Sequence, residues 1–532
     1  MRKRPPAAPH SRLILIPGWI ACQLLAAGLG VLEACPALAA SGPKNRPNIL
    51  LCISDDQSWL HAGAYGNKTV RTPHFDRVAR QGVLFTHAFC AAPSCTPSRS
   101  ALLTGQDIWR LERGGVLYGT LPATFKVYPR MLEDSGYTVG FTGKGWAPGN
   151  YKAGGRTCDP TGNEYARRRN PEPPARSISP CDYAGNFADF LENRTPGKPF
   201  CFWYGAFEPH RPYEPGVGAR TDKAPDDVIV PEFLPNVPEI RKDLLDYYFE
   251  IEWFDRHLGQ MITLLEEAGE LENTIIAVTS DNGMPFPRAK STLYDHGVRM
   301  PLAICWGRQV KPGRVVDDLV SLTDLAPTFL EAAGLPVPAE MTGRSLLSVL
   351  RSDKAGQVDP TRDHIFTALE RHAWCRPEGA TYPMRALRTT GWLYIRNYEP
   401  HRWPAGDPDF ISSHMGLYGE IDNGPAKTYM IEHKDDPAVA RLFQLGFGRR
   451  PAEELYDAAK DPCQLHNLAA DPAAAEVKRR LRDQLEQHLR QTGDPRAEGK
   501  SPWDRYPYYY KDYWRRASTP SVTTSTRPDA TP

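Results

Sequence analysis

The sequence predicts an α/β fold in which a large, mostly parallel central sheet is flanked by helices and followed by a smaller antiparallel sheet. Short, continuous apolar runs recur through the first two thirds of the chain, as expected of strands that are buried on both faces. Segments with helical apolar spacing lie between these runs, and strands that alternate with helices pack as layers. The 51 prolines among 532 residues favour long ordered loops over a helical bundle.

Four apolar runs are the predicted strands of the central sheet: residues 48–53, 137–141, 200–204 and 274–279. The clearest helix is predicted over 243–268, where apolar residues recur three and four positions apart. Ligands of such sheets bind beyond the carboxyl ends of the strands. Polar residues that directly follow the four runs are therefore the first candidates for a functional site.

Three domains or segments are predicted after an N-terminal leader, with bounds at 45–362, 363–492 and 493–532. The second domain contains strand-like runs and a helix from about 474 to 491. The third is a tail that is rich in aromatic residues and then polar. Its tryptophans and tyrosines are expected to pack on the main body, with stacking on a sugar as the alternative, and its last dozen residues are expected to be disordered.

The leader, residues 1–40, resembles a secretory signal peptide. A basic start at Met1–Arg4 precedes an apolar stretch over 13–31, and small residues suit cleavage near Ala39. A retained membrane anchor and a lipid anchor on Cys35 are the weaker alternatives. No later apolar run reaches the ~20 residues that span a bilayer, so the mature chain is predicted to be secreted or periplasmic without a membrane span.

Charge and cysteine content narrow the function further. The formal net charge of +1 gives no reason to expect a nucleic-acid partner. Two of the 11 cysteines fall in the leader, and the odd number that remains suits one cysteine being used for modification. Cys158 and Cys181 could form a disulfide, whereas Cys52, Cys201 and Cys305 lie in apolar runs and are expected to be buried thiols.

Four polar residues follow two of the predicted strands: Asp55, Asp56, Asp281 and Asn282. Because parallel strands end at the same edge of a sheet, these side chains should converge, and three carboxylates would then repel one another. A hard divalent cation with oxygen ligands would remove this repulsion, which points to Ca²⁺ first and Mg²⁺ second. The alternative for each pair is a helix N-cap.

The segment Cys95-Thr96-Pro97-Ser98-Arg99, followed by Ser-Ala-Leu-Leu-Thr-Gly, resembles the signature of the type I sulfatases. A second sulfatase-like signature spans 136–146. The segments Ser280–Pro287 and Tyr382–Arg385 resemble the heparan N-sulfatase (sulfamidase) branch in particular. The likeness covers about residues 46–467 and implies an alkaline-phosphatase-like α/β sandwich.

The resemblance implies that a maturation enzyme oxidises Cys95 to formylglycine, whose hydrate is a geminal diol. A thiolate that attacked sulfate would form a thiosulfate ester, from which sulfate is not easily released. With a diol, one hydroxyl attacks sulfur and releases the alcohol or amine, and loss of the second hydroxyl proton re-forms the aldehyde and expels sulfate. The unmodified alternative for Cys95 is a small buried thiol.

The resemblance also assigns roles to the neighbouring positions. The implied calcium ligands are Asp55, Asp56, Cys95, Asp281 and Asn282. The implied sulfate-handling residues are Arg99, Lys144, His210 and Lys290. Among these, Arg99 orients the diol, the two lysines bind sulfate, and His210 protonates the leaving group. Asp281 is implied to take a proton from the diol.

One position departs from the family pattern. Many sulfatases have a histidine two residues after the lysine of the second signature, where this chain has Trp146. Another imidazole, from His74, His87 or His296, could replace it, and Trp146 itself could face the sugar.

In sulfatases the second domain helps to form the wall of the pocket. Further candidate sugar contacts are therefore His372, Arg376 and Arg385.

The predicted function is a secreted sulfatase that removes O- or N-sulfate from a sulfated saccharide. A non-catalytic glycan-binding protein and a related phosphate-ester hydrolase are the alternatives. The sequence leaves open the sugar, the sulfate position, exo or endo action and the oligomeric state.

Overall fold

The computed structural model describes residues 46–412 and 415–511. The predicted signal peptide and the predicted disordered end therefore lie outside the described residues. In the described ranges, no helix is both long and apolar enough to cross a membrane.

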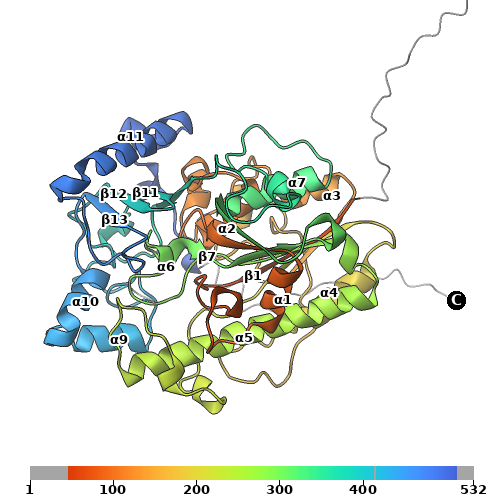
Figure 1. The fold of residues 1–532 in the computed structure, drawn as a ribbon, viewed down its shortest axis with the longest axis horizontal. Coiled ribbons are helices and arrows are strands. Elements are labelled where there is room, and N and C mark those ends of the chain that lie inside the picture. Colours follow the sequence, from red (N-terminus) through yellow and green to blue (C-terminus); the bar gives the residue numbers. More distant parts are fainter. Residues whose placement is uncertain (1–45, 413–414, 512–532) are drawn as a thin grey trace, which may run out of the picture. The chain divides into compact units, whose positions relative to one another are not determined.

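A nine-stranded sheet forms the larger layer (Figure 1), in the order β4-β3-β5-β1-β6-β8-β2-β7 with β9 paired to β2. Its strands are β1 (Asn48–Ser54), β2 (Val83–Phe89), β3 (Thr138–Gly143), β4 (Asn163–Glu164), β5 (Phe200–Gly205), β6 (Thr274–Ser280), β7 (Arg299–Met300), β8 (Leu302–Cys305) and β9 (Arg314–Ser321). The strands from β4 to β6 pair in parallel, whereas β8 pairs antiparallel with β6 and β2. The predicted α/β sandwich with a mostly parallel sheet is confirmed.

Helices cover both faces of this sheet. They are α1 (Pro73–Gln81), α2 (Cys95–Thr104), α3 (Tyr128–Asp134), α4 (Tyr183–Asn193), α5 (Pro238–Glu267), α6 (Asp295–Val298), α7 (Leu325–Ala332) and α8 (Leu347–Leu350). Helix α5 covers residues 243–267 of the predicted helix and starts earlier, because Pro238 occupies its first turn, where a missing N–H costs nothing.

The side chains of β1 alternate between the two helical layers. Ile49, Leu51 and Ile53 are buried with residues of α2, α3 and α7. Leu50 and Cys52 are buried with residues of α1, α4 and α5. A strand that is covered on both faces must be apolar at every position, which explains the continuous run in the sequence.

The strand register brings the carboxyl ends of four strands to one edge. Ser54 of β1 is opposite Ser280 of β6. Gly205 of β5 is opposite Ile53 of β1 on one side and Gly143 of β3 on the other. The loops that leave these four strands therefore start side by side, as expected for the ligand-binding edge of such a sheet.

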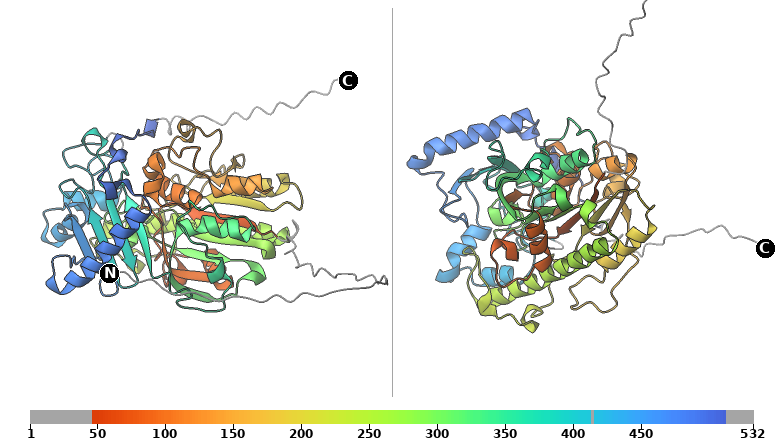
Figure 2. Two further views of the ribbon diagram at one scale, coloured as in Figure 1. Left: turned by 90° about the horizontal axis from the view of Figure 1, so that it is seen from above. Right: turned by 45° about the vertical axis from the view of Figure 1, so that its right-hand side comes forward.

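A second, four-stranded antiparallel sheet has the order β10-β11-β12-β13, and Figure 2 shows it with α11 at one end of the described body. Its strands are β10 (His364–Leu369), β11 (Met384–Thr389), β12 (Trp392–Asn397) and β13 (Glu453–Asp457). The accompanying helices are α9 (Pro425–Glu432), α10 (Pro437–Phe447) and α11 (Ala475–Gln491). Leu481, Leu485 and Leu489 of α11 pack on this sheet at four-residue spacing, and Trp503 is buried in the same cluster.

The cysteines correct one expectation. All nine cysteines of the described residues are free thiols, so Cys158 and Cys181 are not bridged. The Cys181 thiol instead contacts the Thr142 hydroxyl at 3.6 Å, and Cys158 lies near Arg130. Cys52, Cys201 and Cys305 are buried, as predicted.

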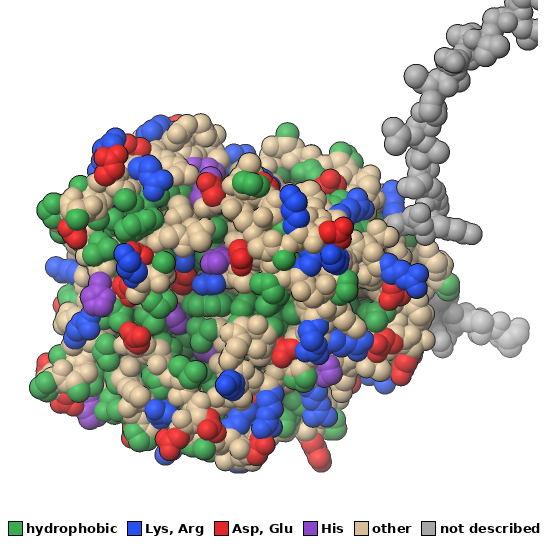
Figure 3. Space-filling model, in the orientation of Figure 1, with side chains coloured by type: hydrophobic (Ala, Val, Ile, Leu, Met, Phe, Trp, Pro, Cys, Tyr) green, Lys and Arg blue, Asp and Glu red, His purple; other side chains and the backbone are tan. Residues whose placement is uncertain are grey.

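Charges of both signs are interspersed on the face drawn in Figure 3, with apolar and neutral side chains between them. This face carries no broad region of one sign, in keeping with the nearly balanced composition.

Candidate active site

The predicted site residues come together at the shared edge of the central sheet. Asp55 and Asp56 directly follow β1, and Asp281 and Asn282 directly follow β6. The two strand ends are joined by a hydrogen bond in which the Asp56 N–H donates to Asp281 Oδ1 at 3.2 Å. Asp56 has a backbone φ of 77°, a left-handed conformation that Asp adopts more readily than most residues.

Cys95 opens helix α2, and its side chain lies against both acidic pairs. Its Sγ is 3.5 Å from Asp55 Oδ1 and 3.7 Å from Asn282 Nδ2. The thiol is 2% exposed. Burial raises the pKa of Cys95 well above the ordinary thiol value, so the unmodified side chain is a poor nucleophile at neutral pH.

The acidic cluster fits a hard divalent cation. One ligand atom from each of Asp55, Asp56, Cys95 and Asp281 lies within 4.8 Å of the others. Two oxygens at this edge, Asp56 Oδ1 and Asn282 Oδ1, are buried without a hydrogen-bond partner among the described residues. Burying unpaired oxygens is costly, and a cation bound between them would remove that cost.

Three buried cations pair with the three carboxylates. Lys144 Nζ is 2.5 Å from Asp55 Oδ2, Lys290 Nζ is 2.7 Å from Asp56 Oδ2, and Arg99 Nε is 2.8 Å from Asp281 Oδ2. Each of the three cationic side chains is at most 5% exposed.

The pKa values of the two aspartates diverge. Burial raises the pKa of Asp56 to about 6, against the opposing charge of Lys290. Burial would also raise the pKa of Asp55, but the charges of Lys144, His210 and Arg99 hold that pKa well below its usual range. The site therefore holds several fixed charges close together and away from water. Such an arrangement can stabilise the charge that develops in a transition state.

His210 lies at the more exposed side of the cluster. Its Nδ1 is 2.6 Å from the Arg211 carbonyl, which can only accept, so Nδ1 carries the proton of the neutral ring. Its Nε2 faces the cluster, 3.8 Å from Asp56 Oδ2, and the side chain is 36% exposed. The loop is fixed because Arg211 makes two 2.7 Å hydrogen bonds to Asp243 of α5.

The expectation that Trp146 faces a sugar needs correction. Its side chain is buried in the main core, and its indole N–H donates to the Ser100 hydroxyl of α2 at 2.8 Å. The backbone N–H of Trp146 donates to Asp159. The indole therefore packs against the helix that carries Cys95 and has almost no solvent-exposed surface with which to contact a ligand.

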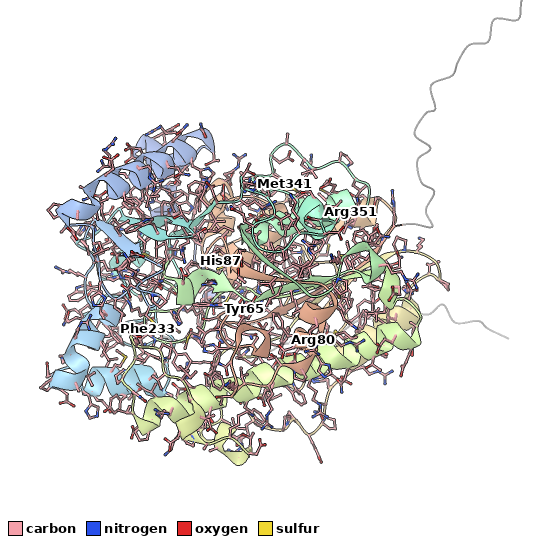
Figure 4. All side chains as sticks on the ribbon, viewed as in Figure 1. Tyr65, Arg80, His87, Phe233, Met341 and Arg351 are labelled. Carbon is pink, nitrogen blue, oxygen red and sulfur yellow. The ribbon has the colours of Figure 1, made fainter. Side chains whose placement is uncertain are left out.

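The three histidines considered as substitutes are engaged elsewhere. His74 packs against Gly259 of α5, and His296 lies between the rings of Trp59 and Phe233. His87 of β2, labelled in Figure 4, hydrogen-bonds the neighbouring Thr86 hydroxyl.

The second half of the chain supplies one imidazole beside Cys95. His372 Nδ1 is 2.8 Å from the hydroxyl of Ser94, the residue that precedes Cys95. Burial lowers the pKa of His372 to about 4, so the ring is neutral at physiological pH.

Arg376 and Arg385, the other candidates from this half, have structural partners instead. Arg376 pairs with Glu420 at 2.7 Å, and Arg385 pairs with Glu370 and Asp494, each at 2.7 Å. Both guanidinium groups are buried in these pairs, so their assignment as sugar contacts is not supported.

Asp422 was not among the residues predicted from the sequence. Its Oδ2 is 3.0 Å from Lys290 Nζ, and it comes from an irregular segment between β12 and α9. One signal was present, because Asp422-Asn423-Gly424 repeats the Asp-Asn-Gly of residues 281–283. Nothing in the spacing, however, indicated which part of the chain this segment contacts.

Two family models match the chain. The model described as Sulfatase matches residues 47–335, and the model described as N-sulphoglucosamine sulphohydrolase, C-terminal, matches residues 288–403.

Individual proteins agree with these matches. N-sulphoglucosamine sulphohydrolase of Homo sapiens is 29% identical over 514 residues, covering 89% of this chain and 94% of the human protein. An ulvan-active sulfatase of Formosa agariphila is 28% identical over 465 residues, covering 86% of this chain and 82% of that protein. A structure solved with its substrate D-glucosamine-2-N,6-O-disulfate superposes with a TM-score of 0.61 at 20% identity, covering 86% of this chain and all of the other.

The first of these relatives and the C-terminal match confirm the predicted resemblance to the heparan N-sulfatase branch. The Sulfatase model covers more than half of the chain and includes the Cys95 segment and both acidic strand ends. The chain therefore belongs to the sulfatase family of sulfuric ester hydrolases.

Proposed function

We propose that this chain removes a sulfate group from a sulfated saccharide, as an O-sulfate ester or an N-sulfate, at the site around Cys95. The observation that carries the proposal is the position of Cys95, which opens α2 within contact of Asp55 and Asn282 and near two buried lysines. Oxidation of Cys95 to formylglycine, by a maturation enzyme, would supply the geminal diol that acts as nucleophile.

A divalent cation, Ca²⁺ in preference to Mg²⁺, would be held by Asp55, Asp56, Asp281, Asn282 and the modified Cys95. The unpartnered oxygens of Asp56 and Asn282 support this set, since all-oxygen ligands suit these ions. When bound, the ion would act as a Lewis acid on a sulfate oxygen and balance the charge that develops as the S–O or S–N bond breaks.

The residues of the chain would bind the sulfate and move protons. Lys144 and Lys290 would hold sulfate oxygens, since both ammonium groups lie in the cluster and are almost fully buried. Arg99 would orient residue 95, one helical turn away, while its guanidinium is fixed on Asp281 and on the Lys144 carbonyl. Charges that are fixed before the reaction do not have to reorganise during it.

His210 would protonate the leaving oxygen or nitrogen. Its ring is the most exposed of the proposed catalytic groups, and its Nε2 faces the cluster while Nδ1 is held by the Arg211 carbonyl. A protonated ring could donate from Nε2 to the leaving group without moving. Asp281 would take a proton from the attacking hydroxyl of the diol. One proton is then removed from the nucleophile for each proton given to the leaving group.

The substrate class is proposed from the relatives. The names of the human and Formosa agariphila proteins refer to a sulfated glucosamine and to ulvan. We therefore infer a sulfated polysaccharide or one of its fragments as substrate. Secretion after cleavage near Ala39, and the domain bounds at 45–362, 363–492 and 493–532, remain part of the proposal.

The test combines chemistry at residue 95 with turnover. The full chain is produced with and without a formylglycine-generating enzyme, and the peptide that contains Cys95 is examined by mass spectrometry. Released sulfate is then measured on defined N- and O-sulfated sugars, before and after chelation of divalent ions. We expect turnover only from oxidised protein with Ca²⁺, and equal turnover from protein with an intact thiol would overturn the proposal.

A further inference from the structure

Asp422, from the second half of the chain, pairs with Lys290, one of the two lysines proposed to bind sulfate. Lys290 Nζ lies between two carboxylates, 2.7 Å from Asp56 and 3.0 Å from Asp422. The family models end at residues 335 and 403, so neither reaches Asp422. The following inference builds on the proposed function, because it concerns which saccharides that site accepts.

A carboxylate is an unexpected neighbour for a lysine that binds sulfate. It competes with the anionic substrate for Lys290, and Asp56 already holds that ammonium group in place. Positioning of Lys290 therefore does not require a second acid. A further role for Asp422 would explain why the site tolerates this competition.

Part of the Asp422 side chain remains accessible. Its Oδ2, on the Lys290 side, is buried, yet the side chain as a whole is 9% exposed. The exposed part therefore belongs to the rest of the side chain, next to the cluster. Among the described residues, no backbone N–H donates to this carboxylate, in contrast to Glu420, which accepts from the Ala373 N–H and from Arg376.

His372 adds a second polar group on the same side. Ser94 engages its Nδ1, and no group of residues 46–412 or 415–511 hydrogen-bonds its Nε2. His372 and Asp422 interact electrostatically with each other and with Lys290 and His210. An accepting carboxylate and an imidazole thus adjoin the residues that would hold the sulfate and protonate the leaving group.

We propose that Asp422, assisted by His372, is a specificity-determining residue. It discriminates between substrates by the substituent next to the sulfated position of the sugar. Its carboxylate accepts a hydrogen bond from a hydroxyl or amine at that position. The same negative charge repels a second sulfate or a carboxylate there, because like charges at short range are strongly unfavourable. The preferred substrate is a saccharide with a hydrogen-bond donor, and no anion, beside the scissile group.

Three sugars that differ only at the neighbouring position test the inference. One has a free hydroxyl or amine, one is deoxygenated, and one has a second sulfate. We expect the wild-type kcat/KM to fall in that order, by roughly 10-fold for the lost donor and by more for the second sulfate. Comparing the sugar that has a hydroxyl with the one that has an amine identifies which donor Asp422 prefers.

Two variants separate hydrogen bonding from charge. Asp422→Asn keeps an accepting oxygen, so discrimination against the deoxy sugar should persist while discrimination against the second sulfate falls roughly 10-fold. Asp422→Ala should lose both. Asp409→Asn removes an exposed carboxylate from the same segment and should leave all three ratios unchanged.

Affinity measurements make the inference independent of turnover. The same sugars are titrated calorimetrically against Cys95→Ser, alone and combined with each Asp422 variant. Discrimination in affinity that depends on Asp422 supports the inference even if no sulfate is released. An equal loss on all three sugars, in affinity and in kcat/KM, would mean that Asp422 only positions Lys290 and would overturn it.

Discussion

The chain contains two buried clusters of charge that differ in how completely their polar atoms are paired. The catalytic cluster, at the carboxyl edge of the central sheet, consists of Asp55, Asp56, Asp281, Asn282, Arg99, Lys144 and Lys290. The β11 cluster, beside the second sheet, consists of Glu370, Arg385, Asp494 and Arg496. Both are nearly excluded from solvent.

In the β11 cluster each carboxylate oxygen has a partner. Arg385 donates to both Glu370 and Asp494, and Arg496 donates to both oxygens of Glu370. In the catalytic cluster, by contrast, Asp56 Oδ1, Asn282 Oδ1 and Arg99 Nη2 are buried without a hydrogen bond among the described residues. Complete pairing is what a structural cluster needs, whereas unpaired buried groups indicate where a ligand belongs.

The largest effect should come from Cys95, which contacts Asp55 and Asn282 of the catalytic cluster. Cys95→Ala removes the proposed nucleophile, and we expect the rate of sulfate release to fall by roughly 10⁴-fold or more. The free energy of unfolding should change by only about 1 kcal/mol, since a small buried side chain is shortened. Cys90→Ala, at another buried thiol just after β2, is the control and should keep full turnover. Substantial activity in Cys95→Ala would contradict the mechanism.

The β11 cluster should respond in the opposite way. Arg385→Met keeps the length of the side chain but leaves Glu370 and Asp494 facing each other with less positive charge. We expect a loss of about 3–5 kcal/mol in the free energy of unfolding, measured by urea denaturation. The kcat/KM per folded molecule should stay within about 2-fold of wild type, because Arg385 touches no catalytic group. A selective fall in kcat/KM with unchanged stability would restore Arg385 as a substrate contact.

The contrast between the clusters also explains what the sequence revealed. Asp55, Asp56, Asp281 and Asn282 directly follow apolar strands, so the parallel sheet alone predicts that they meet. The signature that begins at Cys95 is equally local, because its residues are consecutive in the chain. Such motifs can be identified from the sequence because the residues that follow parallel strands lie at the same edge of the sheet.

The remaining errors involve contacts that are distant in sequence. Arg385 pairs with Asp494, 109 residues away, and no pattern around either residue indicates the pair. Asp422 follows a long irregular segment, so its approach to Lys290 depends on the path of a loop rather than on a period. Trp146 was a candidate sugar contact, but the Ser100 hydroxyl on α2 accepts its indole N–H within the core.

Calcium should stabilise the catalytic cluster and leave the β11 cluster unaffected. If the ion binds the folded chain alone, a concentration 100 times its Kd should raise the free energy of unfolding by about 2.7 kcal/mol. Asp281→Ala removes a proposed ligand and should abolish most of this gain, whereas Arg385→Met should keep it. The measurement is a urea titration of chelated protein with and without added Ca²⁺. A full calcium response in Asp281→Ala would exclude that residue as a ligand.

The smallest effect concerns a buried imidazole outside both clusters. Burial among Tyr183 and Trp253 lowers the pKa of His257 to about 4, from an ordinary value of 6.5. Between these values the unfolded chain binds a proton at this position that the folded chain does not, so stability must fall as pH decreases.

His257→Gln removes that proton uptake. The stability difference between wild type and His257→Gln should therefore shift against wild type by roughly 1.4 kcal/mol per pH unit below pH 6.5. Urea midpoints at pH 7.5, 6 and 5 measure this shift, and a difference that stays constant with pH would show that His257 binds its proton at the same pH in the folded and the unfolded chain. Such a result would mean that burial does not disfavour a charge inside this chain, and the argument from buried groups in the catalytic cluster would lose its physical basis.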